Sequence, residues 1–232
     1  MQRARRLAPI AVVAAVGIIA LTGCRAQPGA AAYVGDKQIT ENQVTEIIDE
    51  VRAKPAPAAA AGAPEATPPT RTFVVSILVL DDVCERFTKA ENLQAKEEAQ
   101  VAQVAQQFGI APETQLAQRT AKLYTCLSAV PTGEPVMPTP EELLALGKVA
   151  KSAGVIEASV SDQAAGDQLN GEQLQAALGN RKVLADAVDR FDVTVNPRYR
   201  PLEFPILSFQ GGPAAVSVPL GEHDTGTVVD AR

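Results

Sequence analysis

The sequence contains no tryptophan and one histidine, His223, which lies between Glu222 and Asp224 near the C-terminus. A catalytic base must be held within hydrogen-bond reach of its nucleophile, so a histidine in a flexible tail argues against a histidine-based triad. These three side chains would bind a metal only weakly, and a solvated tail explains them better. The sequence also has no glycine-rich phosphate-binding loop. We therefore expect no catalytic residues, no cofactor and no metal site.

Aromatic residues make up only 4% of the chain, so the hydrophobic core must be built mostly from alanine, valine, leucine and isoleucine. The length of 232 residues fits one medium-sized domain with appendages. The formal net charge is -6. Because phosphates repel an acidic protein, this charge argues against nucleic acid as a partner.

The N-terminus has the composition of a secretory signal peptide. Three arginines in the first six residues precede an uncharged apolar run over residues 7–23, which ends at Leu21-Thr22-Gly23-Cys24. That ending resembles the lipobox of bacterial prolipoproteins, which implies cleavage after residue 23 and a diacylglycerol lipid on Cys24. An uncleaved membrane anchor is the alternative, because an apolar run of this length is at the lower limit for crossing a bilayer.

Lipidation of Cys24 would place the protein on the extracytoplasmic face of the cell membrane, where its acyl chains hold it stably. Loss of residues 1–23 would change the formal net charge from -6 to -9, because that segment carries three arginines and no acid. The lipid rather than surface charge would then hold the protein on an anionic membrane. Residues 24–30 are expected to form a short tether.

Two further cysteines, Cys84 and Cys126, remain after this segment. Outside the cytoplasm an even number of cysteines favours a disulfide, and the alternative is two buried free thiols that act as small apolar side chains. The pair lacks the C-x-x-C spacing of redox motifs, so we expect a structural bridge rather than a catalytic one.

Apolar periodicity and helix-start signals predict a mainly helical protein. A strand begins near Ala31, and a second short strand covers residues 192–195. Residues 53–70, rich in proline and alanine, are expected to be a disordered loop. The C-terminal segment 201–232 is expected to be a flexible tail, although residues 205–209 would suit a short strand. The predicted helices cover residues 40–52, 71–87, 96–108, 112–130, 140–153 and 172–190.

Three pairs of neighbouring acidic residues lie within these predicted helices. They are Asp81-Asp82, Glu97-Glu98 and Glu141-Glu142. Consecutive residues of a helix point to different faces, so the two carboxylates of a pair do not face one site. We expect all three pairs to be solvated surface.

The opening Tyr33-Val34-Gly35-Asp36, followed by Gln38-Ile39-Thr40 and a capped helix, resembles the start of the SurA-type chaperone N-terminal domain. The order of elements over residues 31–199 is similar to that family as well. The resemblance implies a helical bundle beside a small two-stranded sheet, in which the N-terminal strand pairs with the C-terminal strand. Residues 31–200 would then form one SurA-like helical domain.

Many members of that family carry a parvulin-type prolyl isomerase domain before the late strand. Here only about 60 residues separate Val130 from Phe191, most of them in predicted helices, and none is histidine. Parvulin pockets use histidines, so we expect that isomerase activity is absent.

Two classes of function remain open. The protein would bind unfolded or extended segments of exported polypeptides, as a chaperone does, or it would be a structural or assembly lipoprotein that binds one specific cell-envelope protein. The resemblance supports both, because a fold alone does not specify a function. An exposed apolar patch would favour binding of many polypeptides, and a continuous polar surface would favour the structural role.

The Cys24→Ser variant tests the lipidation hypothesis. A thiol is required for the thioether to diacylglycerol, so we expect the variant to lose labelling by a radioactive fatty acid and to accumulate as the unprocessed precursor. Normal labelling of Cys24→Ser would show that the lipid is elsewhere or absent.

Overall fold

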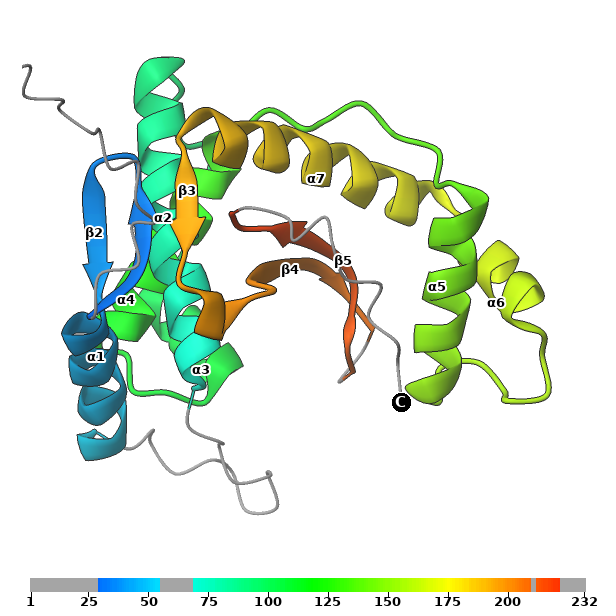
Figure 1. The fold of residues 1–232 in the computed structure, drawn as a ribbon, viewed down its shortest axis with the longest axis horizontal. Helices are drawn as coiled ribbons and strands as arrows, with labels where there is room; N and C mark the ends of the chain where they lie inside the picture. The colour runs from blue at the N-terminus through cyan, green and yellow to red at the C-terminus, as the bar shows by residue number, and fades with distance from the viewer. Residues whose placement is uncertain (1–28, 55–68, 210–211, 222–232) are drawn as a thin grey trace, which may run out of the picture.

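The computed structural model describes residues 29–54, 69–209 and 212–221. The predicted signal peptide, Cys24, most of the tether, nearly all of the proline- and alanine-rich loop, and His223 lie outside these residues. Figure 1 shows how the described elements are arranged. They are β1 (Ala30–Val34), β2 (Lys37–Thr40), α1 (Glu41–Ala53), α2 (Arg71–Ala90), α3 (Val101–Phe108), α4 (Gln115–Ala129), α5 (Pro140–Ser152), α6 (Asp162–Leu169), α7 (Glu172–Arg190), β3 (Val193–Val195), a 3-10 turn (Pro197–Tyr199), β4 (Glu203–Ser208) and β5 (Ala214–Pro219).

The mainly α prediction is confirmed, and local capping chemistry explains several helix starts. The Thr40 hydroxyl accepts a hydrogen bond from the Gln43 amide, and Thr139 with Glu142 forms a complete capping box at α5. The fourth helix does not start at Pro112 as predicted. It starts at Gln115, because the Thr114 hydroxyl caps it.

The predicted pairing of an N-terminal with a C-terminal strand is confirmed: β1 pairs antiparallel with β3, and Tyr33 lies opposite Thr194. The sheet has three strands rather than two, in the order β2-β1-β3. The segment expected to lead into the first helix is itself the strand β2, joined to β1 by a tight turn at Gly35, whose φ is +59°. Glycine adopts this left-handed conformation without steric cost.

Helix α2 forms the centre of the larger of two hydrophobic cores. All eleven residues from Val74 to Cys84 are buried, because α1, α4, α7, β1, β2 and β4 all contact this helix. We call this core, with the three-stranded sheet, α1–α4 and the C-terminal half of α7, the large lobe. A helix buried on every side explains the nearly continuous apolar run in the sequence.

A second core, the small lobe, lies around α5, α6 and the N-terminal half of α7. Leu143 and Leu146 of α5 pack with Leu174 and Leu178 of α7. Helix α6 crosses α5 closely, since a Cβ on Gly166 would lie 2.2 Å from the Leu143 carbonyl oxygen. No apolar periodicity predicts α6, because this helix has eight residues and few large apolar side chains.

Residues 201–209 and 212–221 are not a flexible tail, so that part of the prediction is wrong. Strands β4 and β5 form an antiparallel hairpin beneath α7 (Figure 1). Phe204 and Val218 of the hairpin pack in the large lobe and Val216 packs in the small lobe. Prolines within both strands suggested a loop, but a two-stranded hairpin has free edges on which proline is tolerated.

The connector 131–139 lies directly on α7. Gly133 donates its amide to the Asn180 side-chain oxygen at 3.0 Å, and the Val136 amide donates to the Gln175 carbonyl at 3.0 Å. A Cβ on Gly179 would lie 2.2 Å from the Glu134 carbonyl oxygen. Glycine at 133 and 179 therefore permits the two backbones to touch.

The Gly179→Ala variant tests this contact, because the contact determines whether the substitution raises or lowers the free energy of unfolding. In an isolated helix the substitution would stabilise by about 0.5–1 kcal/mol. Here overpacking should dominate and lower the free energy of unfolding by about 1–3 kcal/mol, which thermal unfolding would detect as a lower Tm. Gly171→Ser, at the start of the same helix and in open space, should leave the Tm unchanged or raise it slightly. A raised Tm for Gly179→Ala would contradict the contact.

Candidate functional site

A pocket of about 290 Å³ lies where the two lobes meet, and we call it the waist pocket. Its apolar lining comes from the end of α4, the start of the connector, α7 and β4. Ile206 of β4 packs against both cores and so marks the junction. The full lining is Lys96, Leu127, Ser128, Val130, Pro131, Thr132, Asn180, Leu184 and Ile206.

The non-helical segment before α3 contributes Lys96 to the lining of the waist pocket. The amides of Lys96 and Glu97 both donate to the Ser128 hydroxyl at 3.1 Å, and the Ala99 amide donates to the Thr125 hydroxyl. Because α4 accepts these amide hydrogen bonds, the third helix begins at Val101 and not at Lys96 as predicted.

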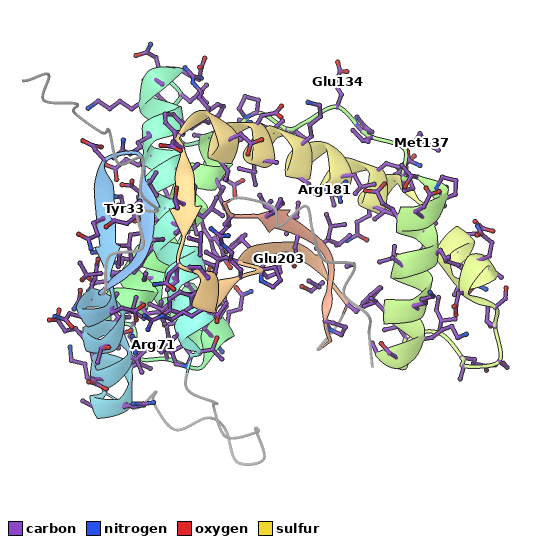
Figure 2. The ribbon with its side chains drawn as sticks, in the orientation of Figure 1. Tyr33, Arg71, Glu134, Met137, Arg181 and Glu203 are labelled. Carbon is purple, nitrogen blue, oxygen red and sulfur yellow. A yellow bond between two sulfur atoms is a disulfide. The ribbon has the colours of Figure 1, made fainter. Side chains whose placement is uncertain are left out.

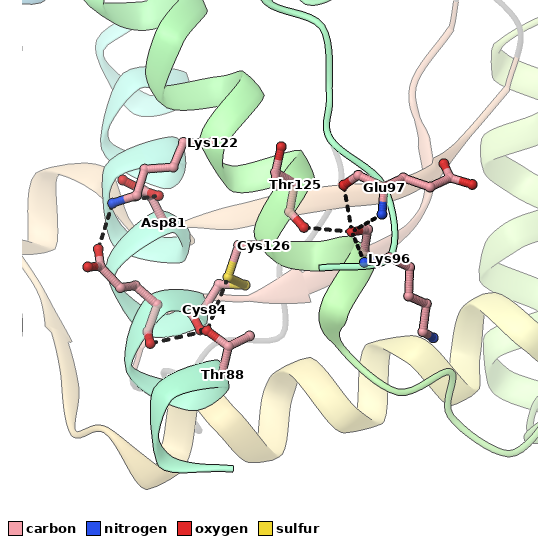
Figure 3. The surroundings of a disulfide bond; sticks show 10 residues. Asp81, Cys84, Thr88, Lys96, Glu97, Lys122, Thr125 and Cys126 are labelled. Carbon is pink, nitrogen blue, oxygen red and sulfur yellow. Dashed lines mark hydrogen bonds and ion pairs between the residues drawn. A yellow bond between two sulfur atoms is a disulfide. The ribbon is translucent and has the colours of Figure 1, made fainter. Parts of the chain in front are cut away.

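The polar groups of the waist pocket differ in their partners. The Ser128 hydroxyl is fully engaged, since it also donates to a backbone carbonyl. The Asn180 side-chain oxygen accepts from Gly133. The Lys96 ammonium, in contrast, has no ion-pair partner among the residues that the structure describes. Figure 3 shows its side chain pointing away from that of Glu97.

The predicted disulfide between Cys84 and Cys126 is confirmed. It joins α2 to α4 with a Cα–Cα distance of 6.2 Å (Figure 3). Closing a loop of this size stabilises a protein by about 4 kcal/mol in the chain-entropy model. Cys126 directly precedes Leu127, so the bridge fixes the end of α4 that lines the waist pocket.

The acidic pair in α2 is buried, so the expectation that it is solvated is wrong. Asp81 is 4% exposed and Asp82 is 7% exposed. Asp82 is stabilised by ion pairs with Lys37 of β2 and with Arg86, whose Nε donates at 3.0 Å. The counter-charge on Lys37 comes from a strand 45 residues away in sequence, which periodicity within α2 could not indicate.

Asp81 has weaker partners than its neighbour. Its carboxylate oxygens lie 3.8 Å from the Arg119 Nη1 and 3.9 Å from the Lys122 Nζ, beyond hydrogen-bond range, and Oδ1 is buried without a hydrogen bond. Lys122 instead donates to Glu85 at 2.6 Å. Burial raises the pKa of Asp81, and attraction to these cations does not offset it.

The N-terminus of α1 is tied to two distant segments through Glu41. Its Oε2 accepts from the Arg71 guanidinium at 2.7 Å and from the Tyr199 hydroxyl at 2.8 Å. Burial by itself would raise the pKa of Glu41, but these hydrogen bonds and nearby Arg198 outweigh it and lower the pKa. Figure 2 shows Arg71 close to α1, and none of the residues of this cluster lines the waist pocket. We interpret this cluster as a structural brace.

Within residues 29–54, 69–209 and 212–221, no group of three or more histidine, cysteine or acidic residues is placed to hold a metal ion. The helices of the same segments include none long and apolar enough to cross a membrane.

Comparisons of the chain with family models, with curated proteins and with solved structures found no match. The resemblance to the SurA-type domain therefore stays a hypothesis from sequence.

The Asp81→Asn variant tests the unfavourable burial of this carboxylate. Folding raises the pKa of Asp81 above its ordinary value near 3.8. Asp81 therefore contributes to the free energy of unfolding at a pH below this ordinary pKa. The contribution is lost as the pH rises through the folded-state pKa. At pH 7 the amide should therefore raise the free energy of unfolding by roughly 1 kcal/mol. Urea unfolding at neutral and acidic pH should show this gain shrinking as the pH falls.

Asp82→Asn is the matched control, because it removes the partner of Lys37 and Arg86. It should lower the free energy of unfolding at pH 7 by about 1–3 kcal/mol. The same sign for both variants at pH 7 would contradict the different environments of the two carboxylates.

Proposed function

We propose that this protein is a membrane-anchored, non-catalytic binding protein for unfolded or extended segments of exported polypeptides. The observation that carries the proposal is the waist pocket, whose lining includes Leu127, Val130, Leu184 and Ile206 from three separate parts of the fold. An open pocket lined mainly by apolar side chains is suited to the side chain of an extended polypeptide.

At the hairpin, side-chain binding is favoured over addition of a strand to its edges. Within the described residues β4 and β5 pair only with each other, which leaves one free edge on each strand. Pro205 is exposed on β4 and Pro219 ends β5. Proline blunts an edge because it cannot donate a backbone hydrogen bond. We therefore place the polypeptide in the waist pocket.

The expected location of the protein outside the cytoplasm also supports the proposal. A structural disulfide fits an oxidising compartment outside the cytoplasm. With a lipid on Cys24, only four residues would separate the anchor from Gly29, the first described residue. That length of chain reaches about 15–20 Å, so the pocket would stay near the membrane where exported polypeptides emerge. A high local concentration compensates for weak affinity.

Polar substitution in the waist pocket tests the proposal. The test uses residues 24–232 with Cys24→Ser, which carries no lipid. Leu127→Gln should reduce the capacity of this protein to delay aggregation of an unfolded protein, because the substitution places an amide among the apolar lining residues. Light scattering measures the delay, and we expect a loss of about threefold or more, as for removal of one buried apolar contact. No variant should accelerate prolyl isomerisation of a test peptide.

Leu144→Gln is the matched control. Leu144 is also a helical leucine, but it is 37% exposed on α5 and does not line the pocket. Leu144→Gln should delay aggregation to the same extent as the unmodified chain. Thermal unfolding would establish that both variants are folded. An unmodified chain with no effect on aggregation would contradict the proposal and would favour the structural role with one envelope partner.

A further inference from the structure

We infer that the waist pocket selects polypeptide segments in which a large apolar side chain lies next to a single acidic side chain. The inference rests on the proposed function and adds a chemical class of ligand to it. It follows from the contrast between the apolar lining of the pocket and the one cation at its rim, Lys96.

The charge of Lys96 is available to a ligand. Other cations near the pocket are paired: Arg181 of α7 contacts Glu142 at 2.5 Å, and Lys182 contacts Asp186 at 3.0 Å. Lys96 lines the pocket, its side chain is exposed, and the described chain offers it no carboxylate. An ammonium at the rim of an apolar pocket favours a ligand whose apolar part fills the pocket and whose carboxylate reaches the rim.

The backbone around Lys96 favours an acidic side chain over the terminal carboxylate of a polypeptide. Capture of a chain terminus commonly uses a group of free backbone amides. Here the amides of Lys96 and Glu97 are both donated to the Ser128 hydroxyl, so neither is free for a ligand. The remaining donor is the flexible ammonium, which acts as a point charge and suits a side-chain carboxylate.

The net charge of the protein limits the number of acidic groups in the ligand. Residues 24–232 carry a formal charge of -9, because residues 1–23 hold three arginines and no acid, and this charge repels a strongly acidic segment at long range. One carboxylate close to Lys96 gains the local attraction without a large long-range penalty. The expected ligand is therefore a segment with one acid beside an apolar residue.

Fluorescent peptides test the inference on residues 24–232 carrying Cys24→Ser. The probes are amidated, unstructured peptides with one leucine followed by aspartate, asparagine or lysine. Fluorescence anisotropy should show the aspartate peptide binding about two- to fivefold tighter than the asparagine peptide at low ionic strength, and the difference should fall with added salt. The lysine peptide should bind most weakly.

Lys96→Met should remove the preference, so that the aspartate and asparagine peptides bind this variant with equal affinity. Lys148→Met is the matched control, because Lys148 is an exposed lysine of α5 outside the pocket lining. It should retain the preference.

The remaining outcomes separate the inference from the proposed function. Equal binding of the aspartate and asparagine peptides would overturn the inference and leave the proposed function standing. Tighter binding of an asparagine peptide with a free C-terminus would overturn it in favour of terminal carboxylates. Displacement of the peptides by decanoate at low concentration would overturn it in favour of a fatty acid. Absence of binding by every peptide would contradict the proposed function itself.

Discussion

Helix α7 is packed into both hydrophobic cores, and the arrangement of the two lobes depends on this shared burial. Leu174 and Leu178 lie in the small lobe, while Leu184 and Val188 of the same helix lie in the large lobe. A helix of 19 residues is about 28 Å long, which is enough to reach both cores. The hairpin β4–β5 bridges the same two cores from below (Figure 1). The waist pocket lies at this bridge, so its shape depends on how the lobes are joined.

Buried ion pairs and a disulfide contribute to the large lobe in addition to apolar packing. Helix α2 carries the buried Asp81 and Asp82 and the disulfide to Cys126 within one turn of each other. The acid at 82 is matched by cations from β2 and α2, while the acid at 81 is not hydrogen-bonded through its Oδ1. The disulfide limits separation of α2 from α4 whatever the charge at position 81, and it fixes the α4 end of the pocket.

Features encoded by neighbouring residues could be predicted from the sequence, whereas features that depend on distant segments could not. The caps at Thr40 and Thr139 use residues three positions apart, and the disulfide follows from the number of cysteines. The late start of α3 depends on hydroxyl groups of α4. The strands β4 and β5 form because they pack against α7. The waist pocket combines side chains from Lys96 to Ile206, so no local pattern could indicate it.

The central claim is that extended polypeptides occupy the waist pocket. A photoreactive residue in place of Thr132, which lines the pocket, tests it directly in intact cells. The same residue in place of Glu134, which points outward from the connector (Figure 2), is the reference. The account predicts crosslinks from position 132 to many unrelated exported polypeptides and few from position 134. Crosslinks to one stoichiometric partner, or equal crosslinking at both positions, would contradict it.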